Sequence, residues 1–458
     1  MPEPGAHPSA DPPRRIPDRE LEAVREIAAT CASPWAARLL VLAFALVALS
    51  GIWSELSPGL RAETASWPRE TIVWPRSAEL RAGWRANGWE GVNWQLRRSI
   101  GSFNRYFERD AVVSRLLRPP IQRALLRLFR YGNGQVVAGT EDDWLVYQID
   151  LFHTVGPPFL APETIERRSR SDWRLHPARQ PDPLSGLRRL KHQLRRLGIQ
   201  LVFMPTPSKL EVYPRRLASG SWREPPRNPS FETLVEELER GGIPVYDPTR
   251  ELFELGRDRD DLYLEGDTHW SPAGLQLVAE GLARFLERRT ELPPHPPVGF
   301  LRRPARIEER LDLLGLLGFP RSAPGRESAI EVVQVLWPDG RQIRVDREPA
   351  DVVLLGDSFS MVYSRLAQRG VSAGFAEHLA AALDRPVHAI ARNRGNILAQ
   401  RSAWLRERPE VLAQARVVVY EVAVRLLSTG DWAPGRLPRT LKSARVASVP
   451  ETGRREQP

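Results

Sequence analysis

The middle and the end of the chain alternate between short apolar runs and segments in which apolar residues recur every three or four positions. The leucines between Leu184 and Leu197 have the second spacing, which places them on one face of a helix. Runs such as those at 199–205, 351–358 and 415–422 are typical of buried strands. Strands and helices in alternation predict an α/β domain whose parallel sheet is flanked by helices.

Turn and cap signals add further elements to this domain. Ser271 is a favourable N-cap residue and Pro272 suits the first helical position, so a helix is predicted over 271–289. Two alternating runs around a Pro-Asp-Gly turn predict an inserted β-hairpin over 331–346, whereas the Pro- and Arg-rich residues 290–325 predict a surface segment. The other predicted elements are helices at 231–242 and 371–384 and strands at 135–139, 144–149, 243–247 and 387–391.

Near the N-terminus, residues 39–54 form an apolar run without a charged side chain. Extended back to Trp35, with Arg38 snorkelling, the segment reaches about 20 residues, enough to cross a hydrocarbon core as a helix. Trp35 and Trp53 lie at its two ends, where interfacial aromatic residues are expected. We expect an uncleaved transmembrane anchor over 35–54. A cleaved signal peptide and a buried core helix are the alternatives, although a signal peptide seldom has so long a segment before its apolar run.

The 458 residues are expected to divide into five parts. Residues 1–34 are Pro-rich and polar and are predicted to be a flexible cytoplasmic N-terminus, followed by the anchor at 35–54. Residues 55–130 contain many Trp and Arg residues and are predicted to be a stalk and lead-in of short helices. The α/β domain then covers 131–430, and a flexible basic tail covers 431–458.

Charge and cysteine content exclude some classes of function. The formal net charge is +10, but the 66 basic residues are interleaved with 56 acidic ones, so a nucleic-acid-binding protein is not indicated. The single cysteine, Cys31, excludes a disulfide within the chain and a cysteine-based metal site. His, Asp and Glu residues are not clustered along the sequence as metal ligands would be, so we predict neither a metal nor another cofactor.

Two loops at expected strand ends carry residues suited to acyl chemistry. Ser358 follows an apolar run in Gly-Asp-Ser-Phe-Ser, where a sharp turn exposes the hydroxyl and the next helix N-terminus can stabilise negative charge. Asp267 precedes His269 by two residues, so its carboxylate can hold the imidazole Nδ1–H and leave Nε2 as a base for the serine. The hypothesis is a triad of nucleophile, base and orienting carboxylate. Taken singly, Gly-Asp-Ser can be an ordinary turn and Asp-x-His a metal half-site or surface loop, and His153 is a spare candidate base.

Together the two loops resemble the alginate O-acetyltransferase family of SGNH-hydrolase-like proteins. GDTHWSPAG at 266–274, followed by LLGDSFS at 354–360, carries the resemblance, and the Asp-x-His pair precedes the serine as it does in that family. VFMPTPSKLEVYP at 202–214 and DDWLVYQID at 142–150 are also similar to family stretches, although in the second an aspartate stands where a glycine is usual. The resemblance covers roughly residues 130–430 and implies an SGNH-hydrolase-like fold.

The resemblance implies the same triad and adds an oxyanion hole. The backbone N–H of Ser358 is the first expected donor. Arg-Asn-Arg-Gly-Asn, after the predicted strand at 387–391, resembles the Asn-x-Gly block of SGNH folds. It makes Gly395 the second expected donor, with Asn393 and Asn396 as further candidates. The third donor of SGNH folds, an asparagine after a later strand, is missing from this chain.

Three more residues are candidate substrate contacts. Arg425 matches an arginine that family relatives carry, and we assign it either a structural role or a role in substrate binding. Lys209 matches a family lysine and is expected either to pair with a nearby carboxylate or to contact substrate. Trp270 follows the candidate base directly and is expected either to stack on a sugar ring or to lie in the core.

The resemblance implies an O-acetyltransferase that moves an acetyl group through an acetyl-serine onto hydroxyls of an exported polysaccharide. A carbohydrate esterase with the same triad and a non-catalytic polysaccharide-binding subunit of a secretion complex are the alternatives. The implied partners are an acetyl donor, supplied by a membrane-bound acyltransferase, and the polysaccharide acceptor. With the expected anchor at 35–54, the expected location is the inner membrane, with one span and with the catalytic domain in the periplasm.

Overall fold

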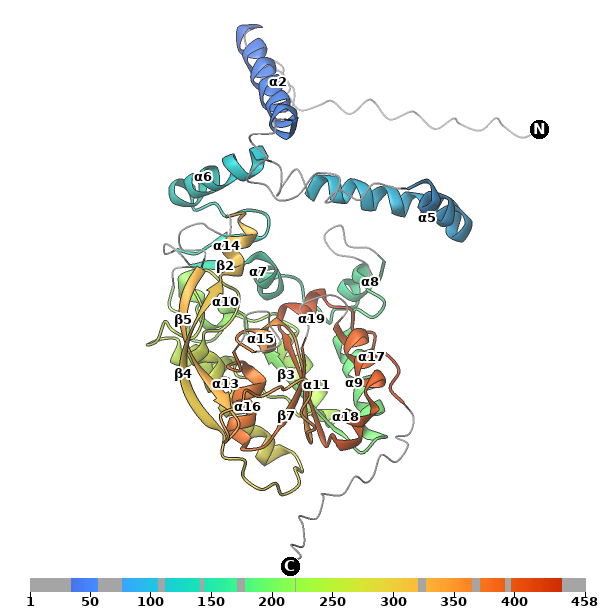
Figure 1. Cartoon of the computed structure of the whole chain (residues 1–458), viewed down its shortest axis with the longest axis vertical. Helices are drawn as coiled ribbons and strands as arrows, with labels where there is room; N and C mark the ends of the chain where they lie inside the picture. The colour runs from blue at the N-terminus through green and yellow to red at the C-terminus, as the bar shows by residue number, and fades with distance from the viewer. Residues whose placement is uncertain are drawn as a thin grey trace, which may run out of the picture. The chain divides into compact units, whose positions relative to one another are not determined.

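The computed structural model describes most of the chain, and Figure 1 labels its helices and strands. The chain divides into two compact units, Met1–Arg118 and Pro119–Pro458. The predicted flexible N-terminus and most of the predicted tail lie outside the described residues. The described residues are 34–56, 76–105, 112–140, 144–170, 178–218, 220–319, 327–364, 371–391 and 397–438.

The first unit is helical in its described part. It contains α2 (Pro34–Leu56) and α5 (Ser77–Arg105), and α6 (Val112–Phe129) begins in it. Asn87 and Gly88 interrupt α5 because their backbone dihedral angles are not helical. Gly88 has a φ of 56°, a conformation that glycine adopts without steric penalty.

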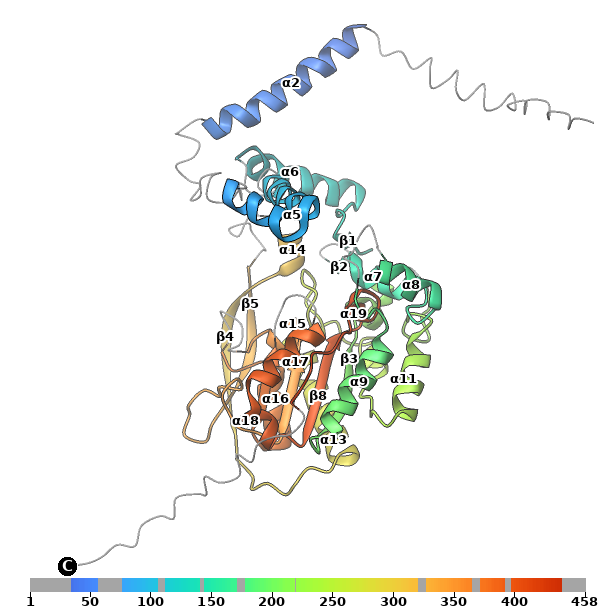
Figure 2. The same cartoon turned by 90° about the vertical axis from the view of Figure 1, so that its right-hand side faces the viewer.

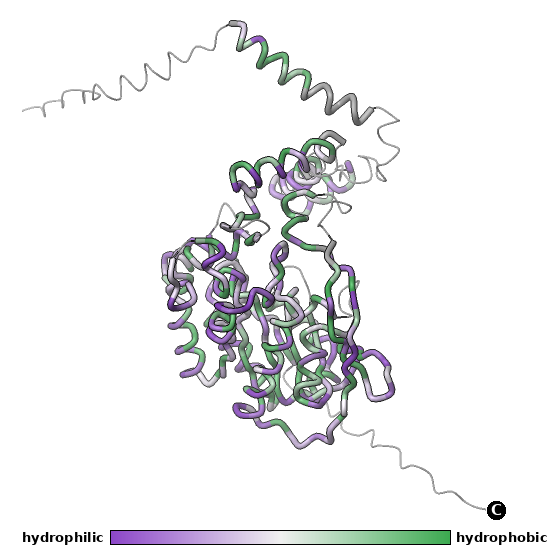
Figure 3. Tube along the Cα trace, turned by 90° about the vertical axis from the view of Figure 1, so that its left-hand side faces the viewer, coloured by the Kyte–Doolittle hydropathy of each residue, from purple (hydrophilic) through white to green (hydrophobic). Residues whose placement is uncertain are grey.

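The segment predicted as a membrane anchor forms α2, whose described part is coloured as hydrophobic in Figure 3. Within the part of the chain that the structure describes, no helix combines the length and the apolar character needed to cross a membrane. The transmembrane part of the predicted fold is therefore not supported.

The second unit is built on a four-stranded sheet in which all neighbouring strands run parallel, as the alternation of strands and helices predicted. The strand order is β3-β8-β6-β7, and Figure 2 shows the sheet between its covering helices. Each strand arises from one of the apolar runs in the sequence. The strands are β3 (Gln200–Thr206), β6 (Val352–Gly356), β7 (Val387–Ala391) and β8 (Val417–Ala423).

Helices cover both faces of this sheet (Figures 1 and 2). One core contains residues of α13 (Pro272–Arg289) and α16 (Phe375–Leu383). The other contains residues of α9 (Pro183–Arg195), α11 (Phe231–Arg240), α17 (Ile397–Glu407) and α18 (Pro409–Gln414). As predicted, Ser271 caps α13: its hydroxyl accepts a hydrogen bond from the backbone N–H of Gly274, and Pro272 is the first helical residue.

Alternate residues of each strand face the two cores. In β6, Val352 and Leu354 belong to the core under α13 and α16, whereas Val353 and Leu355 belong to the core under α9 and α11. Successive side chains of a strand point to opposite faces, so a strand covered on both sides must be apolar throughout. This explains why the uninterrupted apolar runs in the sequence predicted the strands of the sheet.

Several short elements complete the described part of the second unit. The predicted strands at 135–139 and 144–149 form the antiparallel pair β1 and β2. The short elements are β1 (Val136–Ala138), β2 (Leu145–Tyr147), α7 (Gln148–Val155), α8 (Pro162–Arg170), α10 (Lys209–Val212), the 3₁₀ helix η2 (Pro214–Arg216), α12 (Thr249–Leu255), α14 (Asp312–Leu316), α15 (Ser358–Met361) and α19 (Arg425–Thr429).

The inserted hairpin exists, but only one of its two strands was predicted correctly. β5 (Glu327–Leu336) pairs antiparallel with β4 (Leu301–Arg310), which lies in the segment predicted as a surface excursion. Of the hairpin predicted over 331–346, residues 331–336 belong to β5, and the remainder contributes only an isolated bridge between Leu336 and Gln342. β4 has the sequence LRRPARIEER. Its many charged residues and its proline are unfavourable in strands, so residue propensities do not predict a strand here.

The predicted strand at 243–247 is also reduced to a single parallel bridge, between Val245 and Phe203 of β3.

Candidate active site

The turn that carries Ser358 joins β6 to α15 at the carboxyl edge of the sheet. Asp357 caps α15: its Oδ1 accepts a hydrogen bond from Phe359 N at 2.9 Å, and its Oδ2 accepts one from Ala423 N of β8 at 2.8 Å. Ser358 is the first residue of the helix, where a backbone N–H has no acceptor within the helix. The turn therefore presents the serine and its N–H at the end of a central strand, where ligands of α/β sheets bind.

Glu421 supports this turn from below. It is fully buried in β8, and its Oε2 accepts hydrogen bonds from Asp357 N at 2.9 Å and from Ser360 Oγ at 2.7 Å. Its Oε1 accepts one from Thr206 Oγ1 of β3 at 2.6 Å. Burial, followed by the charge of Asp357, raises the pKa of Glu421 to about 7. One carboxyl group thus links β8 to β3 and to the turn that follows β6, called here the nucleophile turn.

Asp267, Thr268 and His269 lie in a loop just before α13, which we call the base loop because it carries the candidate base. His269 Nδ1 is 2.6 Å from Asp267 Oδ1, which also accepts a hydrogen bond from His269 N at 2.9 Å. Because a carboxylate only accepts, Nδ1 carries the proton and Nε2 of the neutral ring has a free lone pair. Burial lowers the pKa of His269, but the charge and hydrogen bond of Asp267 outweigh it and hold that pKa above its ordinary value. The imidazolium charge likewise overcomes burial and lowers the pKa of Asp267.

A second aspartate, Asp312 at the start of α14, is attached to the same loop. Its backbone N–H donates to Asp267 Oδ2 at 2.6 Å. Its Oδ1 accepts a hydrogen bond from Thr268 N at 2.8 Å, and its Oδ2 accepts one from Thr268 Oγ1 at 2.5 Å and lies 3.9 Å from His269 Nδ1. Burial, followed by the charge of Asp267, raises the pKa of Asp312 to about 6.

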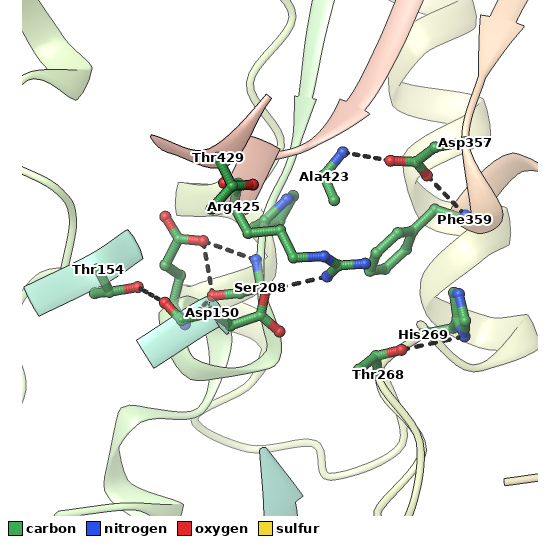
Figure 4. Close-up of polar contacts among 12 residues, drawn as sticks. Asp150, Thr154, Ser208, Thr268, His269, Asp357, Phe359, Ala423, Arg425 and Thr429 are labelled. Carbon is green, nitrogen blue, oxygen red and sulfur yellow. Dashed lines mark hydrogen bonds and ion pairs between the residues drawn. The ribbon is translucent and has the colours of Figure 1, made fainter. Parts of the chain in front are cut away.

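Two contacts bring the nucleophile turn and the base loop together. The ring of Phe359, next to Ser358 in the chain, packs edge-on against the His269 imidazole with 4.9 Å between centroids, and Figure 4 shows the two side by side. Further along, Tyr363 OH donates to the Trp270 carbonyl at 3.0 Å. His269 Nε2 is buried and makes no hydrogen bond with any residue that the structure describes, Ser358 included.

Arg425 lies at the end of β8, beside the nucleophile turn. Its Nη1 pairs with Asp150 of α7 at 3.0 Å, as Figure 4 shows, and its guanidinium lies 5.6 Å from the Phe359 ring centroid. Burial opposes its charge, but Asp150 and Asp357 raise the pKa of Arg425 above its ordinary value. These contacts support the structural role for Arg425, and substrate binding stays a prediction.

Lys209 is a buried structural cation. Its Nζ donates to the carbonyl oxygens of Leu145 at 2.8 Å and of Glu265 at 2.7 Å, where the sequence analysis expected a carboxylate partner or substrate. Burial lowers the pKa of Lys209 to about 8, although neighbouring carboxylates, Asp267 first, oppose the shift. Lys209 therefore ties the base loop to β2 two residues before Asp267.

Trp270 is a core residue. It is fully buried, stacks on Phe375 with 5.1 Å between ring centroids and contacts Phe359 edge-on at 5.2 Å. Of the two roles predicted for it, the core role is the one its surroundings fit, because the indole is not open to a sugar ring. The oxyanion candidates Asn393, Gly395 and Asn396 lie outside the described residues.

Comparison with known proteins assigns the domain. A family model described as the SGNH hydrolase-like domain of the acetyltransferase AlgX matches residues 169–424, which is more than half of the chain. The chain belongs to this family. The resemblance deduced from the motifs is thereby confirmed, and with it the SGNH-like α/β fold.

Curated relatives point the same way. The probable alginate O-acetylase AlgJ of Pseudomonas aeruginosa is 24% identical over 279 residues, 57% of this chain and 64% of that protein. Its counterpart in Pseudomonas putida is 25% identical over 170 residues, 37% of this chain and 38% of that protein. The chain thus spans less than two thirds of the length of the curated relatives it matches.

Solved structures of the family are distant in sequence. The O-acetyltransferase domain of Pseudomonas putida AlgJ is 21% identical, with a TM-score of 0.48, over 64% of this chain and 92% of that chain. Pseudomonas aeruginosa AlgX is 16% identical, with a TM-score of 0.44, over 66% of this chain and 67% of that chain. At these values the family match, and not the structural likeness, supports the fold.

Metal-ligating residue types do meet at one place in the described part of the chain. One ligand atom each of Asp267, His269 and Asp312 lie within 4.8 Å of one another. However, all four carboxylate oxygens already accept hydrogen bonds, and Nδ1 of His269 donates to one of them. The group is therefore a hydrogen-bond network whose carboxylate oxygens and Nδ1 are all engaged and whose His269 Nε2 has no partner among the described residues, which suits acid–base chemistry.

Sequence reasoning missed two supporting carboxyl groups and misjudged a third residue. Glu421 had a detectable signal, since it is the one charged residue in the apolar strand VVVYEVA. Asp312 had none, because it follows a charged strand that was not recognised. His153, the spare candidate base, is fully buried in α7, where its Nδ1 contacts Ser428 Oγ at 2.7 Å and burial lowers its pKa to about 3.

Proposed function

We propose that this protein is an O-acetyltransferase that transfers acetyl groups to hydroxyls of an exported polysaccharide through an acetyl-serine at Ser358. The observation that carries the proposal is the imidazole of His269. It is oriented by Asp267, its Nε2 is unengaged, and it packs against the residue that follows Ser358. The family match and the alginate O-acetylase relatives supply the class of reaction.

In the first half-reaction, His269 Nε2 removes the proton of the Ser358 hydroxyl while Oγ attacks the acetyl carbonyl. Asp267 stabilises the imidazolium that forms. The backbone N–H of Ser358 is one donor to the oxyanion of the tetrahedral intermediate. Collapse of that intermediate expels the donor's leaving group, which takes up the proton from the imidazolium, and leaves an acetyl ester on Ser358.

In the second half-reaction, a sugar hydroxyl replaces the donor. His269 Nε2 accepts its proton, the sugar oxygen attacks the acetyl ester, and Ser358 Oγ leaves and recovers a proton. Water in place of the sugar would make the protein an esterase. The catalytic groups are the same for both, so the acceptor decides between them.

The experiment is acetyl transfer from p-nitrophenyl acetate to defined mannuronate oligosaccharides, followed by mass spectrometry of the sugars. We expect acetylated oligosaccharide with the native protein and none with Ser358→Ala or His269→Ala, while Ser169→Ala and His192→Ala, at exposed positions of α8 and α9, serve as matched controls. Release of acetate without acetylated sugar would identify an esterase. Polymer acetylation that persists in cells carrying Ser358→Ala would identify a non-catalytic binding subunit.

The proposal includes a location and a supplier. A polysaccharide acetylated during export is met outside the cytoplasm, so we propose that the domain works in the periplasm and receives acetyl groups from a membrane-bound acyltransferase. Cell fractionation with an antibody to the domain tests the location. Recovery in the cytoplasmic fraction would contradict it.

A further inference from the structure

The base loop and α14 hold each other through hydrogen bonds in both directions. Asp312 N donates to Asp267 Oδ2, and the Asp312 carboxylate accepts from the backbone and hydroxyl of Thr268. Thr268 separates Asp267 from His269, so a fixed Thr268 fixes the two catalytic neighbours relative to each other. None of the predicted triad members provides this support.

Buried apolar contacts hold α14 in place, so it can fix the position of the base loop. Its Leu313 and the following Leu317 are fully buried in a small core shared with Val136 of β1 and Leu145 of β2. Gly266 lies so close to α14 that an added Cβ would approach Leu311 Cδ1 to 3.0 Å, which is tighter than ordinary van der Waals contact. The inserted segment that contains β4, α14 and β5, residues 301–336, therefore packs directly against the base loop.

Charged groups of both signs surround His269. Asp267 contacts Nδ1 and Asp312 Oδ2 lies 3.9 Å from it, and both favour the imidazolium, whereas Arg425 disfavours it. Around Asp312, the charges of Asp267 and His269 act in opposite directions, and the buried ammonium of Lys209 interacts with both aspartates. Because 36% of the Asp312 side chain is exposed, solvent and salt partly screen its electrostatic interaction with His269.

We propose that Asp312 is a positioning residue of the acyl-transfer site, which clamps Thr268 so that His269 faces Ser358 and stabilises the imidazolium formed when the serine is deprotonated. This inference rests on the proposed function. Asp267 remains the direct partner of the ring, and Asp312 acts through the loop and through its charge.

Two variants separate the clamp from the charge. Asp312→Ala removes both, and we expect kcat for acetyl transfer to fall about tenfold or more with little change in KM. Asp312→Asn retains an oxygen acceptor for Thr268 N but has no charge. We expect it to restore most of kcat while the pH at half-maximal kcat moves down by about one unit, because the imidazolium is less stabilised. Glu308→Gln, on exposed β4 of the same insertion, is the control for loss of one negative charge and should match the native protein.

Titration of the His269 ring by NMR makes the inference independent of the transfer assay. We expect the ring to lose its proton at lower pH in Asp312→Asn than in the native protein, even if no acceptor sugar is found. A native protein without acetyl transfer but with this shift would contradict the proposed function alone. Unchanged titration and unchanged pH profile in Asp312→Asn, or full kcat in folded Asp312→Ala, would overturn the role of Asp312.

Discussion

The two halves of the candidate site are supported in different ways. The nucleophile turn is held by the sheet itself, because Asp357 is bonded to Ala423 of β8 and Glu421 of β8 reaches under the turn. The base loop is held by an insertion, through Asp312 on the five-residue helix α14. Glu421 is fully buried, whereas the Asp312 side chain is about a third exposed.

This contrast indicates in which half of the site a substitution should affect activity more than stability. A change beneath the nucleophile turn disturbs buried hydrogen bonds that link β8, β3 and the turn itself, so folding and chemistry should suffer together. A change in the carboxylates of the base loop alters the protonation and orientation of one imidazole while the sheet stays intact. Matched substitutions should therefore lower stability in both halves but lower activity far more in the base loop.

The largest expected effect comes from the same amide substitution made in both halves. Asp267→Asn removes the acceptor that fixes the His269 tautomer, so acetyl transfer should fall by roughly 10³–10⁴-fold. The amide can accept from only one of His269 N and Asp312 N, so unfolding free energy should also fall by about 1–3 kcal/mol. Asp357→Asn can satisfy only one of the two backbone N–H groups of Phe359 and Ala423, so unfolding free energy should fall by about 1–3 kcal/mol. Steady-state kinetics and denaturant unfolding of both variants measure the contrast. Equal losses of activity in the two variants would break it.

Trp270 tests the core that the two halves share. Trp270→Ala should lower the unfolding free energy by about 3–5 kcal/mol, since a large buried side chain is lost between Phe359 and Phe375. Trp270→Phe should be much milder, because the indole Nε1 makes no hydrogen bond with the described residues. In Trp270→Phe, KM for the acceptor sugar should not change. A rise in that KM without a loss of stability would revive the sugar-stacking role.

The smallest of the three effects concerns Glu421. Glu421→Ala leaves Asp357 N, Ser360 Oγ and Thr206 Oγ1 without this partner, and unfolding free energy should fall by about 2–3 kcal/mol together with kcat. Glu421→Gln should keep the fold, since an amide can accept from the turn and donate to Thr206.

The pH dependence of stability sharpens this test. The pKa of Glu421 is raised to about 7 in the folded protein, so its contribution to stability is full below the unfolded pKa and is lost as pH rises through about 7. Denaturant unfolding between pH 4.5 and 8 should show this loss in the native protein and less of it in Glu421→Gln. Identical profiles for the two proteins would argue against the shared carboxyl as the support of the turn.

The same contrast explains what the sequence could reveal. The sheet was predictable because strands covered on both faces, such as Val352 to Gly356, must be apolar throughout. Asp267 and His269 were found because their spacing is local and their chemistry is specific. Asp312 was not, because its contact to Thr268 spans 44 residues and depends on a β4 strand whose charged sequence matches no strand pattern.

The most direct test is to map the acetyl group after brief exposure of the native protein to p-nitrophenyl acetate, acid quench and peptide mass spectrometry. The account predicts one acetyl ester on the peptide that contains Ser358. It predicts none there in Ser358→Ala and a strongly delayed one in His269→Ala. An acetyl group on another residue, or one that forms on Ser358 equally fast without the imidazole, would contradict it.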